Sequence, residues 1–276
     1  MDRIRLIASD MDATLLDEQS QLPADFEETI HALAELGIRF APASGRPLYT
    51  LEAMFPTLRD ELVFIGDNGG AIRWKGQNLF TSEMSPEGWR ALNRLTREQG
   101  DIAVLCGLES AYVERPFAVH DAVLRHFYTK IEYVDRLEDV AAPADKFTIY
   151  LPQHNAQQAY DTVYASQRSI YSVAVAGECW VDIMNPGVHK GAALQTLGQL
   201  WGLPSESMMA FGDTYNDAEM LRTAKYGFLM ENGSVPLRQK VPFLAPSHRE
   251  AGVMQVLHRV LAQNGCVCPE DFIPAH

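Results

Sequence analysis

The 276-residue sequence predicts an α/β fold in which a Rossmann-like core with a parallel sheet is interrupted by an inserted α+β domain. Two observations predict this arrangement. Short apolar segments alternate with amphipathic helical segments near both ends of the chain, as they do in parallel βαβ units. Between these regions lies a long stretch in which the alternation is lost. The length of the chain also favours two domains, at about 150 residues each.

The first βαβ unit starts almost at the N-terminus. Residues 4–9 form a largely apolar run that ends at an acidic cluster, which is typical of a buried parallel strand. Residues 24–36 place apolar side chains on one face of a helix, and Gly37 follows as a helix stop. Two more strands and a hairpin are predicted at residues 38–43, 62–65 and 71–80. Ligands bind at the carboxyl ends of parallel strands, so the loops after these strands are where a site is expected.

The middle of the chain, residues 81–183, has no acidic clusters at its strand ends. Two helices are predicted there, at residues 86–99 and 156–167. Four short strands are predicted at residues 102–105, 146–151, 171–175 and 179–183. The alternation typical of parallel βα units then returns. Helices are predicted at residues 190–201 and 252–263, and strands at residues 208–211 and 226–230. We therefore expect a core made of residues 1–80 and 184–276, with residues 81–183 as the inserted domain.

The composition excludes several classes of function. The net charge of −13 argues against a surface that binds nucleic acid or an anionic membrane. No apolar run reaches 18 residues and the N-terminus does not resemble a signal peptide, so we expect a cytoplasmic protein. Of the four cysteines only Cys266 and Cys268 are close, and we expect free thiols rather than a zinc site. Nothing in the composition indicates the oligomeric state.

Two carboxylates and a hydroxyl follow the first predicted strand, at Asp10, Asp12 and Thr14. Two close carboxylates raise each other's pKa unless a cation or a shared proton relieves their repulsion. One of them could be ionised on a metal while the other holds a proton for acid–base chemistry. The alternative is that Asp12 and Thr14 only cap a turn or a helix.

A second acidic loop, residues 212–217, follows the predicted strand at 208–211. Asp10 and Asp213, from separate strands, would offer Mg²⁺ the carboxylate oxygens that it prefers. The alternative is a solvated turn in which Asn216 or Asp217 caps the next helix.

Two further segments offer groups for a phosphate. Ser44 and Gly45 supply a hydroxyl and an unhindered backbone N–H at a strand end. Lys190 lies at a helix start, where acidic side chains are favoured, so its charge is expected to face an anion. Ser44 as a helix cap and Lys190 as a solvated side chain are the ordinary alternatives.

In order and spacing these motifs resemble those of the haloacid dehalogenase (HAD) superfamily and, more closely, of its Cof-type sugar-phosphate phosphatases. Three more segments carry the resemblance over nearly the whole chain, namely Ile65-Gly66-Asp67-Asn68-Gly69, Lys190-Gly191 and Glu250-Ala251-Gly252-Val253. The resemblance implies a HAD core, a C2-type cap formed by the insert, and Mg²⁺ as the cofactor.

The resemblance also implies roles for single residues. Asp10 resembles the nucleophile that forms an aspartyl-phosphate and binds Mg²⁺. Asp12 resembles the general acid–base, whose backbone carbonyl is a further metal ligand, and Asp213 resembles a metal-binding acid. The phosphate-binding and supporting positions correspond to Ser44, Gly45, Lys190, Asn216, Asp217 and Thr14. Ala13 replaces the glycine usual in the family, and a positive φ there would strain the loop.

The sequence therefore predicts a Mg²⁺-dependent phosphatase that hydrolyses small phosphorylated metabolites, such as sugar phosphates, through an aspartyl-phosphate. A phosphomutase or a specialised sugar-phosphate, nucleotide or cofactor phosphatase on the same fold is the first alternative. A non-catalytic phosphate-binding regulatory module is the second, with Ala13 as its one hint. In the insert, the candidates for facing the cleft are Arg115, His120, Glu178 and Trp180, for which a surface or core position is the alternative.

Overall fold

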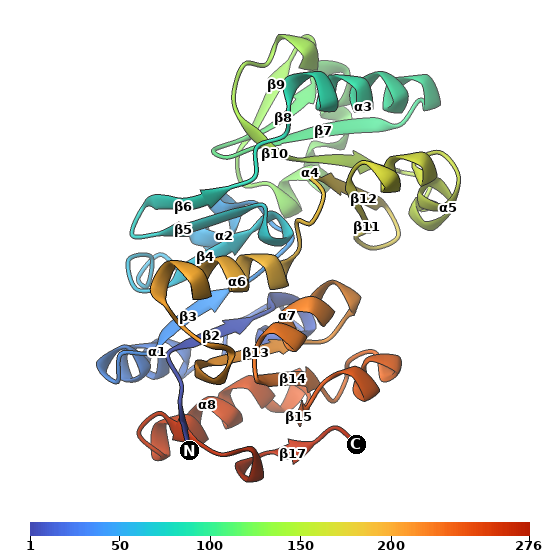
Figure 1. Ribbon diagram of the computed structural model, residues 1–276. Coiled ribbons are helices and arrows are strands. Elements are labelled where there is room, and N and C mark those ends of the chain that lie inside the picture. The colour runs from blue at the N-terminus through green and yellow to red at the C-terminus, as the bar shows by residue number, and fades with distance from the viewer.

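The computed structural model describes residues 1–276 and confirms the α/β class. Its central sheet has the strand order β17-β15-β14-β13-β2-β3, in which every pair is parallel except β15 and β17. The strands are β2 (Leu6–Ser9), β3 (Arg39–Pro42), β13 (Met208–Gly212), β14 (Tyr226–Met230), β15 (Phe243–Ala245) and β17 (Ile273–Pro274). This sheet lies in the lower half of Figure 1, together with both ends of the chain.

Helices cover both faces of this sheet because its strands are apolar on both sides. The helices are α1 (Phe26–Glu35), α2 (Leu48–Ala53), α6 (Lys190–Trp201), α7 (Ala218–Thr223) and α8 (Gly252–Ala262). Ile7 of β2 belongs to the core cluster formed with α1 and α8. Its neighbours Leu6 and Ala8 belong to the cluster formed with α6 and α7. This alternation along one strand fixes which face each helix covers.

A three-stranded antiparallel sheet follows, made of β4 (Val63–Gly66), β5 (Ala71–Trp74) and β6 (Gln77–Thr81). The sequence predicts β4 as another parallel core strand, but only one parallel bridge, between Ala43 and Ile65, joins it to the central sheet. Directly after β4 the chain reverses, and β4 pairs with β5 in antiparallel fashion instead. The predicted hairpin turn is present at Lys75 and Gly76, both of which have positive φ.

The third sheet forms a separate part of the molecule, which we call the cap, at the top of Figure 1. Its strand order is β11-β12-β10-β7-β8-β9. The strands are β7 (Ile102–Gly107), β8 (Ala111–Glu114), β9 (Ile131–Val134), β10 (Ala144–Tyr150), β11 (Ser172–Val175) and β12 (Trp180–Met184). The helices are α3 (Pro86–Gln99), α4 (Asp121–Phe127) and α5 (Ala156–Asp161). Neither β8, β9 nor α4 is among the elements predicted from the sequence.

The predicted helix at residues 156–167 is wrong in its second half. Helix α5 ends at Asp161, and a short 3₁₀ turn covers Ala165–Ser169. The break falls at two β-branched residues, Thr162 and Val163, which disfavour helix. Tyr164 is fully buried and donates a hydrogen bond to Thr96 Oγ1 over 3.3 Å, so tertiary packing holds the chain in the broken form.

The two segments that connect the core to the cap are tied together by Asn185. Its side-chain amide donates hydrogen bonds to the backbone carbonyls of Ser82 and Glu83, over 3.2 and 2.8 Å. A small two-stranded sheet, β1 (Asp2–Arg3) with β16 (Cys266–Val267), completes the core. None of the helices combines the length and the apolar composition needed to cross a membrane.

Candidate active site

The candidate site lies where the parallel strands β2, β3 and β13 end. Their registers pair Ser9 with both Pro42 and Phe211, so the loops that follow leave the sheet at the same level. Asp10 follows β2, Ser44 lies just beyond β3, and Asp213 follows β13. A cavity of about 490 Å³ opens among these loops and the cap turn at residues 175–177. It is lined by six of the predicted site residues, namely Asp10, Asp12, Ser44, Gly45, Asp213 and Asn216.

Lys190 is the first residue of α6 and is fully buried. Its ammonium nitrogen lies 2.5 Å from Asp10 Oδ1 and 2.7 Å from Asp217 Oδ1. The charge that is unfavourable at a helix start therefore faces two carboxyl groups. His189, to which the sequence gives no role, caps α6, because its Nδ1 accepts the N–H of Ala192 over 3.1 Å.

Three carboxylates converge beside this lysine. Oxygen atoms of Asp10, Asp213 and Asp217 all lie within 4.8 Å of one another. Burial raises the pKa of Asp10 to about 8; the nearby Asp217 adds to the rise, and Lys190 opposes it. Burial, with Asp217, also raises the pKa of Asp213 to about 6. One lysine does not balance three buried acids, and hard oxygen donors of this kind fit Mg²⁺.

Asp217 has little freedom to act as a metal ligand. Its Oδ2 accepts the backbone N–H groups of Asp213 and Thr214, over 3.0 and 3.1 Å, while its Oδ1 faces Lys190. A Cβ atom at Gly212 would lie 2.4 Å from the Asp217 Cβ, so only glycine fits beside this carboxylate. The capping role that the sequence left as an alternative is present here, together with the contact to Lys190.

Asp12 does not pair with this lysine. Its carboxylate is 58% exposed and accepts a hydrogen bond from Arg46 Nη2 over 2.8 Å. An exposed carboxylate beside the cavity is free to exchange protons with a bound molecule or with water. Thr14, in contrast, is buried and its hydroxyl contacts no hydrogen-bonding partner, so the capping alternative for Thr14 is not what the structure shows.

Ala13 has a φ of 57°, the left-handed conformation that favours glycine. Asn232, in the loop after β14, holds it there by donating a hydrogen bond to the Ala13 carbonyl over 2.8 Å. The Asn232 side-chain oxygen in turn accepts the N–H of His248 over 3.0 Å. Asn232 is not among the residues predicted from the sequence, although it follows the end of a strand, as Asp10 and Asp213 do.

An Ala13→Gly variant is expected to raise the free energy of unfolding by up to about 1 kcal/mol, because glycine removes the left-handed strain. Urea denaturation of both proteins measures the change. Ala32→Gly, in the middle of α1, is the matched control and should lower the free energy by about 0.5–1 kcal/mol. A loss of stability in Ala13→Gly would show that Ala13 carries no such strain.

The loop after β3 presents Ser44 and Gly45 to the cavity. Ser44 Oγ accepts the N–H of Arg46 over 3.1 Å, which leaves the hydroxyl hydrogen free to donate. The Gly45 carbonyl accepts a hydrogen bond from Lys146 Nζ of the cap over 2.6 Å. Asn216 also lines the cavity and is exposed, and its Oδ1 accepts the Thr214 hydroxyl over 2.5 Å.

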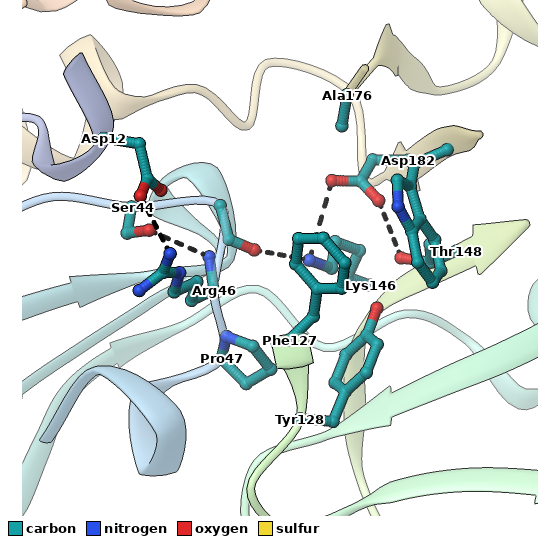
Figure 2. Close-up of a pocket in the computed structure, with 12 residues that line it drawn as sticks. Asp12, Ser44, Arg46, Pro47, Phe127, Tyr128, Lys146, Thr148, Ala176 and Asp182 are labelled. Atoms are coloured by element: carbon teal, nitrogen blue, oxygen red, sulfur yellow. Dashed lines mark hydrogen bonds and ion pairs between the residues drawn. The ribbon is translucent and has the colours of Figure 1, made fainter. Parts of the chain in front are cut away.

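A second cavity, of about 170 Å³, adjoins the first on the cap side (Figure 2). Of the four cap candidates only Trp180 lines it. Arg115 pairs with Asp135 and Glu178 with His154, both exposed, and His120 packs against Tyr150. Lys146 and Asp182, which also line the cavity, were missed because they lie in β10 and β12 among apolar residues, where sequence gives no sign that buried charges will meet partners.

Comparisons with a family model, with curated proteins and with solved structures all find matches over most of the chain. A family model described as haloacid dehalogenase-like hydrolase matches residues 7–257. The 5-amino-6-(5-phospho-D-ribitylamino)uracil phosphatase YbjI of Escherichia coli is 32% identical, covering 94% of this chain and 96% of that protein. The HMP-PP phosphatase of Cronobacter sakazakii is 31% identical over 87% and 89% of the two chains. The crystal structure of SMU.1108c from Streptococcus mutans matches with a TM-score of 0.84 and 29% identity, over 94% and 99% of the chains.

Proposed function

Because the chain belongs to the haloacid dehalogenase-like hydrolase family, we propose that it is a Mg²⁺-dependent phosphatase of small phosphorylated metabolites that works through an aspartyl-phosphate on Asp10. The observation that carries the proposal is the buried contact of Lys190 with Asp10, at the wall of a cavity where a second acid, Asp213, faces the same space.

The residues present fit the metal. Asp10 and Asp213 would hold Mg²⁺, together with the backbone carbonyl of Asp12, whereas the oxygens of Asp217 are already engaged by Lys190 and by backbone N–H groups. When bound, Mg²⁺ would supply positive charge against the phosphoryl oxygens and keep Asp10 ionised.

The chain's own residues account for the remaining chemistry. A carboxylate oxygen of Asp10 attacks phosphorus, and the bond from phosphorus to the leaving oxygen breaks in line with it. The carboxylic acid of Asp12 gives its proton to that leaving oxygen. Asp12 then takes a proton from the water that attacks phosphorus and frees Asp10. Throughout, Lys190, the Ser44 hydroxyl and the Gly45 N–H offset charge on the phosphoryl oxygens.

The partner is therefore a small phosphorylated molecule. The two curated relatives support this class, because one acts on a phosphorylated ribitylamino-uracil and the other on HMP-PP. The cavity beside Asp10 has a volume of about 490 Å³, which also suits a small metabolite rather than a macromolecule.

Release of inorganic phosphate from a panel of sugar phosphates, phosphorylated polyols and nucleotides tests the proposal. We expect turnover with Mg²⁺ that is lost in EDTA and returns when Mg²⁺ is added in excess. Turnover that is insensitive to EDTA would contradict the metal requirement. The absence of phosphate release from every ester, by folded protein with Mg²⁺ present, would contradict the phosphatase assignment itself.

An Asp12→Asn variant is expected to lower kcat by about 100- to 10,000-fold, because the leaving oxygen and the attacking water both lose their proton-transfer group. Mg²⁺ affinity, measured by calorimetry, should stay close to the wild-type value, since only the Asp12 backbone would touch the metal. A large loss of Mg²⁺ affinity with kcat retained would instead make the Asp12 side chain a ligand.

A further inference from the structure

The loop after β14, residues 231–234, contacts both acidic loops of the candidate site. The Asn232 amide donates a hydrogen bond to the Ala13 carbonyl over 2.8 Å, directly after the proposed acid–base. The backbone N–H of Ser234 donates to the Asp213 carbonyl, also over 2.8 Å. Because β13 lies between β14 and β2, this loop crosses the end of β13 to reach the loop after β2. It therefore ties the loop of the proposed acid–base to the loop of a proposed metal ligand.

The loop after β2 is anchored at its ends but not in its middle. Met11 and Thr14 are buried, whereas Asp12 is exposed and Ala13 is partly exposed. The bond from Asn232 is the only side-chain hydrogen bond to the backbone between these two anchors. The orientation of the peptide groups on either side of Ala13 therefore depends on Asn232.

The side chain at position 13 makes this dependence stronger than it would be for a glycine. Ala13 has a φ of 57° and a ψ of 14°, in the left-handed region that alanine disfavours and glycine does not. Without the hydrogen bond, we expect Ala13 to relax toward the right-handed or extended region. Such a rotation would turn the preceding peptide group and displace the side chain of Asp12.

The second contact of Asn232 fixes the orientation of its amide. The side-chain oxygen accepts the N–H of His248 over 3.0 Å, so the NH₂ group is the end that faces the Ala13 carbonyl. His248 begins a short turn, His248–Glu250, which leads into α8, a helix that packs into the core through the buried Val253. An exposed loop of the site is thereby connected to a well-packed helix.

The position of Asp12 matters because this residue lines both cavities. Its carboxylate is bonded only to Arg46 Nη2, over 2.8 Å, and Figure 2 shows the two groups beside Ser44. A general acid must lie within hydrogen-bonding reach of the oxygen that it protonates, and a small misplacement lowers the rate. A displaced loop would therefore impair proton transfer first.

We propose that Asn232 is a positioning residue for the proton transfers of Asp12. By holding the Ala13 carbonyl, Asn232 keeps the loop after β2 in the conformation that presents the Asp12 carboxyl to the cavity. This role rests on the proposed function, because it requires Asp12 to exchange protons with a phosphate ester and with water. Attack by Asp10 should depend on Asn232 much less, since Lys190 holds Asp10 separately.

Two phosphate esters with different leaving groups test this role. 4-Nitrophenolate leaves as a stable anion without a proton, whereas the oxygen of an alkyl ester needs a proton as its bond to phosphorus breaks. The alkyl ester is the sugar or polyol phosphate that the wild-type protein hydrolyses fastest. In Asn232→Ala we expect kcat/KM to fall by at least about tenfold for the alkyl ester and by less than about threefold for 4-nitrophenyl phosphate.

The ratio of the two rates separates positioning from a loss of folded protein, because both esters meet the same preparation. An Ala13→Gly change should rescue the Asn232→Ala protein, since glycine keeps the left-handed conformation without the hydrogen bond. In the double variant the ratio should return to within about threefold of the wild-type ratio.

Urea denaturation gives a second measure that needs no turnover. The midpoint should fall further when Asn232→Ala is introduced into the wild-type protein than when it is introduced into Ala13→Gly protein, because only alanine needs the hydrogen bond to stay left-handed. Equal falls would show that Asn232 does not hold Ala13, and would overturn the role.

Gln255→Ala is the matched control. Gln255 also donates an exposed side-chain amide hydrogen bond of 2.8 Å to a backbone carbonyl, that of Glu250, but it does not bond to the loop after β2. Both of its rates should equal the wild-type rates.

The remaining outcomes separate this role from the proposed function. An unchanged ratio in folded Asn232→Ala protein, or an equal fall for both esters, would overturn the positioning role and leave the phosphatase in place. An altered ratio that persists in the double variant would overturn it too, because the effect would not act through Ala13. No phosphate release from either ester by the wild-type protein would overturn the phosphatase and the role together.

Discussion

An Asp10→Asn variant is expected to release phosphate at least about 1,000-fold more slowly than the wild-type protein, because the amide cannot attack phosphorus and cannot carry a negative charge toward a cation. The fold should survive the change. Asparagine has the same shape as aspartate, and Lys190 keeps the 2.7 Å contact with Asp217. Phosphate release from one ester at saturating Mg²⁺ measures the loss, and circular dichroism checks the fold.

Asp135→Asn is the control for this experiment, since Asp135 is 85% exposed in the cap and pairs only with the exposed Arg115. Its rate should match that of the wild-type protein. Near-normal phosphate release by folded Asp10→Asn protein would contradict the nucleophile assignment.

A Lys190→Met variant is expected to lose both stability and activity. Methionine fills a similar volume but leaves the Asp10 and Asp217 carboxylates buried together without their shared cation, which should lower the free energy of unfolding by about 3–5 kcal/mol. The loss of positive charge beside the phosphoryl oxygens should lower kcat/KM by at least about 100-fold. Urea denaturation and phosphate release at low temperature measure the two effects separately.

Lys225→Met is the matched control for stability. Lys225 pairs with Asp2 over 2.7 Å, but its side chain is 39% exposed, and solvent screens such a pair, so that it contributes little to stability. A stability loss in Lys190→Met no larger than that in Lys225→Met would show that the buried ion pairs do not hold the loops together.

The loops of the candidate site could be predicted because they follow a simple rule of the parallel sheet. Apolar runs mark the strands, acidic residues follow them, and parallel registers place the carboxyl ends at one edge. Lys190 was predicted to face an anion because a lysine at a helix start is electrostatically misplaced unless an anion lies nearby. In the structure its ammonium group faces two carboxyl groups, those of Asp10 and Asp217.

The cap was less predictable because its chemistry depends on contacts between distant segments. Lys146 in β10 pairs with Asp182 in β12 and with Asp67 in a core loop. No local sequence pattern predicts that these charges will be buried together. Tertiary packing also reinforces the break after Asp161, because the buried Tyr164 hydroxyl donates a hydrogen bond to Thr96 Oγ1.

Asp217 combines two roles that the sequence leaves as alternatives. From the sequence, its carboxylate either caps the next helix or contributes to the site. In the structure, one oxygen of Asp217 accepts backbone N–H groups while the other faces Lys190. The residue does both because a carboxylate has two oxygens and the loop places one on each side.

The most direct measurement is to trap the phosphoryl group on Asp10. Protein is mixed with a good substrate and Mg²⁺, quenched within milliseconds, and treated with borohydride, which reduces an acyl phosphate and converts the aspartate to homoserine. Peptide mass spectrometry then identifies the altered position. We expect homoserine at position 10 only when substrate and Mg²⁺ are both present. Reduction at Asp12 or Asp213 instead, or at no carboxylate during active turnover, would contradict the assignment of Asp10 as the nucleophile.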